Sequence, residues 1–242
     1  MNDKLLLIDK PAGITSHDTV DHIRRLYKTR RVGHAGTLDP FATGLLIVGV
    51  GKATKQLTGL VGLDKTYIAE LTLGAASTTF DPEGVITPCS PIRPPNRPDI
   101  ERALDKFRGE YDQRAPLYSA KKIRGQKLYD LARAGKATED MRPIKRVCIP
   151  ELSILAYDFP TLRLHVACSS GTYIRSLADD IGHTLGCGAY LSTLRRTRIG
   201  HYLIQDAHTL AELPFIDDSR ARCKTQFSVI ARSEATRQSL FL

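Results

Sequence analysis

The sequence predicts an α+β fold with a mixed, largely antiparallel sheet, flanking helices and a central cleft. Paired strand-like runs and unevenly interspersed helical patterns favour this class over a doubly wound sheet, in which strands and helices alternate regularly. Length also contributes, because 242 residues can bury a real core as one large domain or as one domain plus a remnant.

The N-terminal part of the chain contains two predicted strands separated by a helix and a glycine-rich loop. Residues 5–8 form a short apolar run that Lys, Pro and Gly at positions 10–13 end, which is typical of a buried strand. Ser16 is the candidate N-cap of a helix whose apolar face recurs at positions 20, 23 and 27. A second apolar, strand-like run covers residues 45–48.

Later segments supply three more strands and two helices. Period-two alternation predicts a strand over residues 67–73, and the five prolines of residues 88–98 predict an extended connector. Apolar positions 100, 103, 104 and 107 have the spacing of an amphipathic helix. Strands over residues 152–159 and 162–168 are predicted to pair antiparallel, and a helix follows over residues 174–185.

Basic residues outnumber acidic ones and gather in clusters. The chain has 35 Lys and Arg against 26 Asp and Glu, a formal net charge of +9, which makes an anionic partner plausible. The clusters lie at residues 121–127, 142–146 and 195–198. A single cluster of this kind is usually a solvated face, but three of them beside the motifs described below favour a phosphate-binding surface.

Cysteine usage and hydropathy indicate a cytoplasmic protein. The five cysteines are widely spaced and contain no C-x-x-C pair, which argues against a zinc ribbon and a disulfide framework. Reduced thiols are the simple interpretation. The first apolar run is too short for a signal peptide, and no stretch approaches the length of a membrane span.

A glycine-rich loop over residues 33–44 places one carboxylate, that of Asp39, in a restrained position. Gly36 and Gly44 permit backbone angles closed to other residues, while Pro40 is rigid and keeps Asp39 out of the helical region. Such a loop suits a nucleophile or a base presented into a cleft. The alternative is an ordinary Asx turn, which the Asp-Pro dipeptide alone favours.

Residues 33–44 resemble the catalytic motif of the bacterial TruB family of tRNA pseudouridine synthases. Segments 7–16, 65–74, 119–121, 171–175 and 194–200 resemble further family motifs and follow in family order. The resemblance covers about residues 4–212. It implies a catalytic domain over residues 1–212, followed by a short tail over residues 213–242. That tail would be a truncated or divergent replacement for the usual RNA-binding domain, and its composition predicts an exposed or disordered segment.

The resemblance implies isomerisation of uridine to pseudouridine in the T loop of tRNA, at position 55, with no cofactor and no metal. Asp39 would be the nucleophile, and Arg175 would offset the cost of ionising it in a dry pocket. Tyr67 would stack on the target base and help to remove a proton. Without the resemblance, Tyr67 is better explained as a packed core residue, and Arg175 is equally well explained as a helix surface charge.

Further residues are implied to contact the RNA or the base. Leu191 corresponds to an apolar pocket wall. The implied RNA contacts are His34, Lys10, Lys121, Arg195, Arg196 and Arg198. The expected partner is the T-arm stem-loop of tRNA, bound by a monomer through salt-dependent phosphate contacts.

Three other functions compete with this interpretation. A non-catalytic RNA-binding or tRNA-folding protein could use the same scaffold, but it would not need Asp39, Tyr67 and Arg175 together. A synthase guided by an RNA partner is a second alternative, and a metal-dependent hydrolase a third. For the hydrolase the sequence offers only Asp179 and Asp180, which point about 100° apart on a helix and are better explained as solvated charge. Residues 81–84 are expected to form a hairpin turn.

Overall fold

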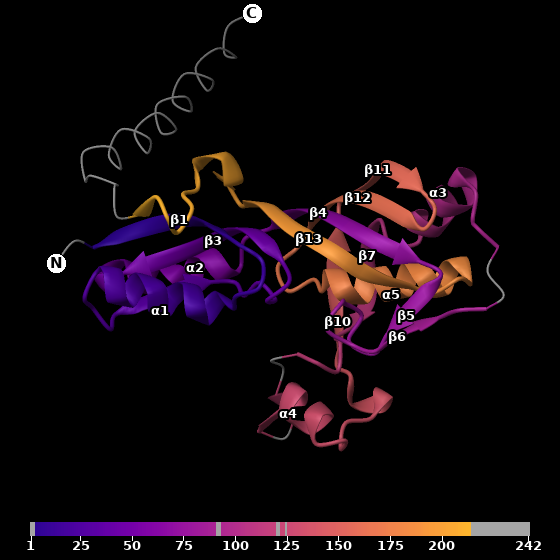
Figure 1. The fold of residues 1–242 in the computed structure, drawn as a ribbon, viewed down its shortest axis with the longest axis horizontal. Coiled ribbons are helices and arrows are strands. Elements are labelled where there is room, and N and C mark those ends of the chain that lie inside the picture. Colours follow the sequence, from indigo (N-terminus) through magenta and orange to yellow (C-terminus); the bar gives the residue numbers. More distant parts are fainter. Residues whose placement is uncertain (1–2, 91–92, 120–121, 124, 214–242) are drawn as a thin grey trace, which may run out of the picture.

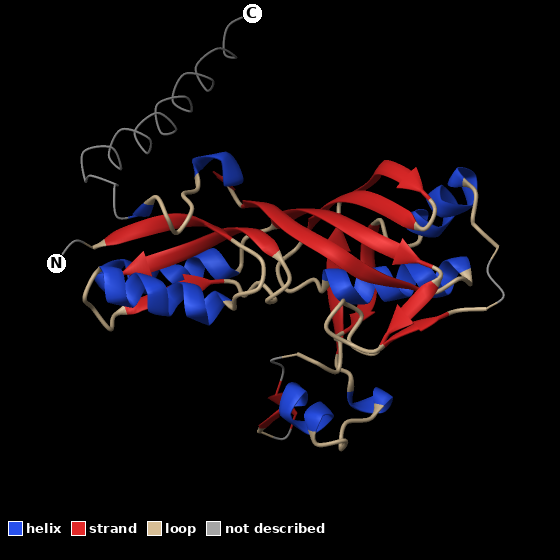
Figure 2. Cartoon of the chain, viewed as in Figure 1, coloured by secondary structure: helices blue, strands red, loops and turns tan. Residues whose placement is uncertain are grey.

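The computed structural model describes residues 3–90, 93–119, 122–123 and 125–213 and confirms the predicted fold class. Its centre is an eight-stranded mixed sheet in the order β1-β3-β13-β4-β12-β11, with β2 paired to β3 and β14 to β13 (Figures 1 and 2). The strands of this sheet are β1 (Lys4–Lys10), β2 (Val32–Ala35), β3 (Thr43–Val50), β4 (Lys65–Leu73), β11 (Glu151–Asp158), β12 (Thr161–Cys168), β13 (Ala189–Ile199) and β14 (Tyr202–Leu203).

Helices and short hairpins surround this sheet. Helix α5 packs on β13 and β4, while α3 packs on α5 and β11. The helices are α1 (Ser16–Leu26), α2 (Leu57–Val61), α3 (Arg97–Asp105), α4 (Leu128–Arg133) and α5 (Ile174–Leu185), with 3-10 turns η1 (Gly51–Gln56), η2 (Glu139–Met141) and η3 (Ile204–Asp206). The two-stranded pairs are β5 (Ala75–Ser77) with β6 (Ile86–Pro88), β7 (Gly109–Arg114) with β10 (Ile144–Ile149), and β8 (Lys122–Ile123) with β9 (Gln126–Lys127).

Strand β13 joins two parts of the sheet, β1 and β3 on one side and β4, β12 and β11 on the other. It runs antiparallel to β4 along its length and parallel to β3 at Arg195–Arg196, opposite Thr43–Gly44. This contact requires Gly44, whose φ is +103°, because a Cβ there would lie 2.3 Å from the carbonyl oxygen of Arg196. The sequence analysis did not predict β13, and its register shifts interrupt the regular alternation on which such a prediction depends.

The segment 67–73 is the strand whose prediction from alternation is most directly confirmed. Along β4 the side chains at 65, 67, 69, 71 and 73 are buried, and the intervening ones are partly exposed. The buried face packs with β12 and α5 in the largest apolar cluster of the described residues, which includes Leu71, Leu164 and Leu177. The strands over 152–159 and 162–168 and the helix over 174–185 are likewise present.

The start of α1 differs from the prediction. Its N-cap is Thr15, whose side chain accepts from the backbone N–H of Asp18, while the Asp18 carboxylate accepts from Thr15 in return. Ser16 is buried instead, and its Oγ donates to the carbonyl of Leu38 (3.0 Å) and accepts from the N–H of Leu38 (2.9 Å). Ser16 therefore fixes the residue that precedes Asp39.

The proline-rich connector is shorter than predicted. Pro88 ends strand β6, and Pro98 lies in the first turn of α3, where its missing N–H costs nothing. Residues 93–96 lie outside regular elements.

A segment between β7 and β10, residues 115–143, projects away from the sheet and carries α4 (Figure 1). We call it the protruding segment. Its two ends are tied together where they leave the body: the Ala115 N–H donates to the carbonyl of Pro143 (3.0 Å), and Arg142 Nε donates to the carbonyl of Ala115 (2.8 Å).

At the predicted boundary between domain and tail, after residue 212, the chain still packs against the N-terminal strands β1 and β3. Leu213, which the prediction assigned to the tail, is buried with Ile8 and Val48 in an apolar cluster. Residues 214–242 lie outside the described part of the chain. No helix within the described part is both long enough and apolar enough to cross a membrane.

Candidate active site

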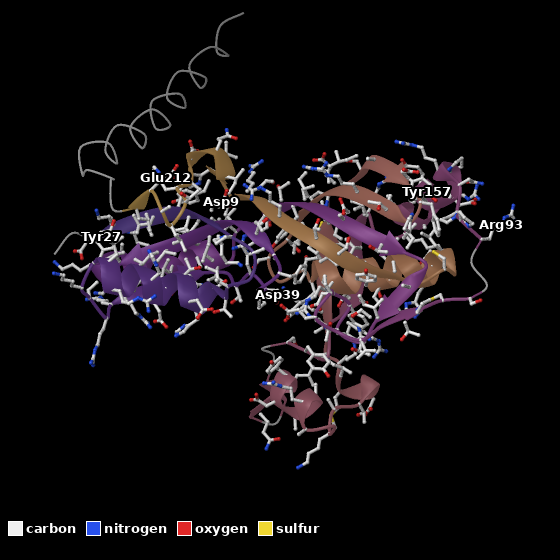
Figure 3. All side chains as sticks on the ribbon, viewed as in Figure 1. Asp9, Tyr27, Asp39, Arg93, Tyr157 and Glu212 are labelled. Atoms are coloured by element: carbon white, nitrogen blue, oxygen red, sulfur yellow. The ribbon has the colours of Figure 1, made fainter. Side chains whose placement is uncertain are left out.

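The predicted loop carries Asp39 at the junction of the two halves of the sheet (Figure 3). We call residues 36–44 the nucleophile loop. Two buried cations hold its backbone. Lys10 Nζ donates to the carbonyl of Pro40 (3.3 Å), and Arg196 Nη2 donates to the carbonyl of Gly36 (2.9 Å). Together with Ser16 on Leu38, these contacts leave the Asp39 side chain 35% exposed on a fixed backbone.

The carboxylate of Asp39 is paired with Arg175, as the resemblance implied. Arg175 Nε lies 3.0 Å from Asp39 Oδ2, and Nη2 lies 3.4 Å from Oδ1, so both carboxylate oxygens face the guanidinium. Arg175 belongs to the first turn of α5 and is buried, with 7% of its surface exposed. A buried cation that faces both oxygens fixes the orientation of the carboxylate.

Groups from other segments hold Arg175 in turn. We call Arg175, Thr79, Asp81 and Tyr118 together the arginine array. Its Nη1 lies 3.1 Å from Asp81 Oδ2 and donates to the carbonyl of Thr79 (3.1 Å), while Nη2 donates to the carbonyl of Tyr118 (3.1 Å). The guanidinium therefore links the nucleophile loop to the β5–β6 connection and to the protruding segment.

Asp81 is the site residue that the sequence analysis missed. It lies in the predicted turn of the β5–β6 hairpin, but its carboxylate is buried, accepts from the Glu83 N–H (3.0 Å) and pairs with Arg175. Asp-Pro in a turn is the ordinary pattern for a solvated residue. The only sequence signal was the concentration of polar residues that precedes it at 77–79.

Tyr67 faces the interior beside the nucleophile loop. It belongs to the apolar cluster that also contains Leu38 and Ala42, and 7% of its surface is exposed. Burial raises the pKa of its hydroxyl, and the nearby guanidinium of Arg196 opposes that shift. The hydroxyl is therefore kept protonated, which does not favour a role as a base.

Lys10 and Arg196 require a correction, because the structure turns both away from solvent. Lys10 is fully buried and donates to the carbonyls of Pro11 (2.8 Å) and Ile14 (2.7 Å) as well as Pro40. Burial lowers its pKa to about 8, although the carboxylate of Asp39 favours the charged form. Arg196 is 1% exposed and donates to the carbonyl of Leu45 (2.7 Å). Neither cation can reach a phosphate in this arrangement, and both hold the nucleophile loop.

The other predicted RNA-binding residues lie in different settings. Arg195, whose side chain is 43% exposed, pairs with Asp9 (2.7 Å), and Arg198 is exposed on β13. His34 on β2 is half-buried, and burial followed by the charge of Arg196 lowers its pKa. Its Nδ1 has no hydrogen-bond partner among the described residues. Lys121 lies outside the described residues.

Leu191 also differs from its predicted role. Its side chain is fully buried in the core between β13 and β4, and its N–H donates to the carbonyl of Phe80 (3.0 Å). Leu191 therefore packs in the interior, because its place on β13 points it inward, and its contact with the base stays a prediction.

Asp179 is another correction, since it is buried rather than solvated, with 8% of its surface exposed. Burial raises the pKa of the adjacent Asp180 to about 6. Across the described residues, no three His, Cys, Asp or Glu side chains gather closely enough to hold a metal ion.

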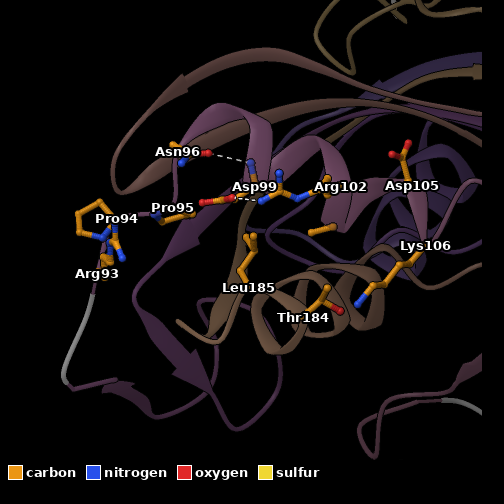
Figure 4. Close-up of a pocket in the computed structure, with 11 residues that line it drawn as sticks. Arg93, Pro94, Pro95, Asn96, Asp99, Arg102, Asp105, Lys106, Thr184 and Leu185 are labelled. Carbon is orange, nitrogen blue, oxygen red and sulfur yellow. Dashed lines mark hydrogen bonds and ion pairs between the residues drawn. The ribbon is translucent and has the colours of Figure 1, made fainter.

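One hollow of the described surface lies beside the arginine array, and another lies far from it. One of about 400 Å³ borders the arginine array between the β5–β6 connection and the protruding segment, and its lining is largely apolar: Thr78, Thr79, Phe80, Pro116, Leu117, Tyr118, Ala132 and Ala137. The other lies between α3 and the end of α5 and contains no residue of the arginine array (Figure 4). There the charges of Asp99 and Arg102 pair with each other.

The chain is similar to known proteins over most of its length. A family model described as the N-terminal domain of TruB family pseudouridylate synthase matches residues 24–174, and one described as the tRNA pseudouridylate synthase B C-terminal domain matches residues 175–219. The chain is similar to the tRNA pseudouridine synthase B of Clostridioides difficile, with 40% identity over 94% of this chain and 75% of the relative. It is also similar to that of Mycobacterium sp. (strain KMS), with 46% identity over 86% of this chain and 71% of the relative.

Solved structures are similar as well. A chain of a Cbf5-Nop10-Gar1 complex matches with a TM-score of 0.67 and 29% identity, covering 87% of this chain and 53% of that one. A chain of an H/ACA RNP bound to a substrate RNA containing 2'-deoxyuridine matches with a TM-score of 0.66 and 27% identity, covering 87% and 52%. The chain therefore spans about half the length of these two solved chains.

Proposed function

The chain belongs to the TruB family of tRNA pseudouridine synthases, isomerases that convert uridine to pseudouridine in tRNA, and from this premise we propose that Asp39 attacks the T-loop uridine at position 55. The observation that carries the proposal is the half-exposed carboxylate of Asp39 facing the buried guanidinium of Arg175 at 3.0 Å. A carboxylate held in this way is oriented and still accessible, as a nucleophile must be.

The isomerisation breaks the N-glycosidic bond between N1 and C1′, turns the base and joins its C5 to C1′ of the same sugar. C5 loses a proton and N1 gains one. Atoms and electrons balance without an oxidant or a second substrate. The Asp39 carboxylate supplies the transient covalent partner, at C6 of the base or at C1′ of the sugar. Arg175 faces both oxygens of that carboxylate and holds its orientation.

We assign Tyr67 to packing against the target base rather than to proton removal. Burial raises the pKa of its hydroxyl, so the phenolate is scarce near neutral pH. Its aromatic ring beside the nucleophile loop is suited to stacking, which contributes about 1–3 kcal/mol per base in single-stranded complexes. Stacking of that size offsets part of the cost of extruding a uridine from the T loop.

The proposed RNA contacts are the exposed cations Arg195 and Arg198, together with His34 near the nucleophile loop. Arg195 and Arg198 alternate with inward-facing Arg196 along β13, so they present charge to solvent while Arg196 holds the loop. Contacts of this kind release counterions from the T-arm and make binding weaken as salt rises.

The same chain supplies both Asp39 and Arg175, so we propose a catalytic domain, residues 1–212 by the sequence boundary, that acts as a monomer. The cysteines at 89, 148, 168 and 187 are free thiols, which suits the cytoplasm, where we place the enzyme.

The test is to incubate the protein with unmodified tRNA and to map pseudouridine by primer-extension stops after carbodiimide treatment. We expect a stop for position 55 with wild-type protein. Asp39→Asn should lower turnover by at least about a thousandfold while tRNA affinity stays within a few-fold, because the amide keeps the size and loses the nucleophile. The matched control is Asp64→Asn at an exposed aspartate, which should retain wild-type turnover.

A stop elsewhere in the tRNA would overturn the assignment of position 55. Substantial turnover by Asp39→Asn would overturn the nucleophile, and tight binding without turnover by the wild-type protein would favour the non-catalytic alternative.

A further inference from the structure

Phe80 adopts a backbone conformation that its residue type disfavours. Its φ is +64°, in the left-handed region, where the β-carbon of a non-glycine residue meets the backbone. A conformation like this persists only where the surroundings impose it. Here its N–H donates to the carbonyl of Ser77 (3.0 Å), and its carbonyl accepts from the N–H of Leu191 (3.0 Å).

The two neighbours of Phe80 in the chain are both partners of Arg175. The Thr79 carbonyl accepts from Arg175 Nη1, and the Asp81 carboxylate pairs with the same nitrogen, each at 3.1 Å. Because Phe80 lies between them, any rotation of its backbone moves both partners. The conformation of Phe80 therefore bears on two of the contacts of Arg175, those with Thr79 and Asp81.

The ring of Phe80 is held in turn by Arg142, at the base of the protruding segment. The guanidinium carbon of Arg142 lies 5.0 Å from the ring centroid, and the residue is 8% exposed. A cation over an aromatic face is attracted more strongly when both are removed from water. The same guanidinium donates through Nε to the carbonyl of Ala115 (2.8 Å), so it ties the ring to both ends of the segment.

We propose that Phe80 and Arg142 are positioning residues for the reaction, whose stack sets Thr79 and Asp81 so that Arg175 faces Asp39. The proposal rests on the function assigned above to Asp39 and Arg175. The stack is a second contact between the β5–β6 connection and the protruding segment. The first is made by Arg175, which donates to Thr79 in the connection and to Tyr118 in the segment. Neither ring nor guanidinium touches the reacting atoms.

Arg142 has a charged neighbour besides the uncharged ring of Phe80, and the experiment has to separate the two interactions. The charge of Arg142 also acts on the carboxylate of Asp180 on α5. Substituting Arg142 therefore disturbs α5 as well as the stack. Phe80 variants are the primary probe, because they change the ring and leave every charge in place.

The test compares kcat and KM of Phe80→Leu and Phe80→Tyr on unmodified tRNA, with the thermal midpoint of each variant. Leucine keeps apolar bulk and a branched side chain but lacks the aromatic face, so kcat should fall about tenfold with KM within about twofold. Tyrosine keeps the face and should restore kcat to within about twofold of wild type. The matched control is Tyr27→Leu, which removes another aromatic face under a cation, the Nζ of Lys4 at 4.9 Å, far from the array; it should leave kcat unchanged.

A double-mutant cycle then tests the pairing itself. If the ring acts through the guanidinium, Arg142→Gln should lower kcat as Phe80→Leu does, and the double variant should be no slower than Arg142→Gln alone. Independent, additive losses would overturn the stack, as would wild-type kcat in Phe80→Leu. Failure of Phe80→Tyr to restore kcat would overturn it too.

These outcomes are distinct from failure of the proposed function. An active Asp39→Asn variant would overturn the nucleophile whatever Phe80 does. An inactive Asp39→Asn beside a fully active, folded Phe80→Leu would overturn only the positioning proposal.

Discussion

The two sides of the Asp39 carboxylate are built in different ways. The nucleophile loop is held through its main chain, by Ser16 on Leu38, Lys10 on Pro40 and Arg196 on Gly36. The arginine array is held through charges and carbonyls that three separate segments bring together around Arg175. One side fixes a backbone, and the other fixes a single side chain.

This difference predicts different failures. A main-chain anchor can be weakened by degrees, because the remaining hydrogen bonds still restrain the loop. The contacts of a lone guanidinium between two carboxylates cannot be weakened by degrees. Removing it leaves two acidic groups facing each other with no positive charge between them. The array should therefore be the more sensitive side.

The largest effect is expected from Arg175→Met. Methionine keeps an unbranched stem but loses the charge that pairs with Asp39 and Asp81, so kcat should fall by at least about a hundredfold. Steady-state kinetics on unmodified tRNA measures this. Arg175→Lys should recover only part of the loss, since an ammonium cannot face both oxygens of Asp39 and reach the other partners together. Full recovery by lysine would mean that only the charge matters and that the array has no geometric role.

An intermediate effect is expected from Asp81→Asn. The amide oxygen can still accept from the Glu83 N–H, but the ion pair with Arg175 is lost, so kcat should fall about tenfold with KM little changed. Glu83→Gln, at an exposed carboxyl two residues away, is the matched control and should behave as wild type. Equal effects of the two variants would show that overall charge near the site matters, rather than the Asp81–Arg175 contact.

The smallest effect tests the nucleophile loop through pH. Burial lowers the pKa of Lys10 to about 8 from 10.5, so above pH 8 its amine loses a proton and one of the donors that hold nearby carbonyls. Turnover should fall a few-fold as pH rises through about 8. Stability should move the other way: the unfolded chain binds more protons between these pKa values, so the contribution of Lys10 to folding free energy becomes more favourable as pH rises from 8 to 10.5.

Lys65 complicates this profile, because burial also lowers its pKa to about 8. Comparing Lys10→Met with Lys65→Met separates them, since Lys65 donates to the carbonyls of Val61 and Leu63, away from Pro40. The fall in turnover should disappear in Lys10→Met, which is slower throughout, and persist in Lys65→Met. The opposite result would assign the titration to Lys65.

The sequence predicted the fold class, because alternation and helical spacing are local patterns. The pair formed by Asp39 and Arg175 was implied by the family resemblance, since the residues alone left Arg175 equally well explained as a helix surface charge. It did not predict that Asp81 joins them, since nothing in a turn sequence indicates a partner on a helix far along the chain. It also could not tell Arg195 from Arg196. Adjacent residues of a strand face opposite ways, and only the undetected strand β13 decides which one points inward.

The short parallel contact between β3 and β13 has a consequence for when the protein becomes competent during its own synthesis. It brings together residues about 150 positions apart, as in the hydrogen bond from Thr43 to Leu194, whose separation is 151. Asp39 and Arg175 are separated by 136 positions. Contacts at such separation require the closure of a long loop, whose entropic cost comes before any stabilisation by the contacts. When a ribosome has released only the first half of this chain, the nucleophile loop is already made. Arg175, Arg195 and Arg196, which position the loop and its carboxylate, are still missing. Catalytic competence therefore arises only when the last strands emerge.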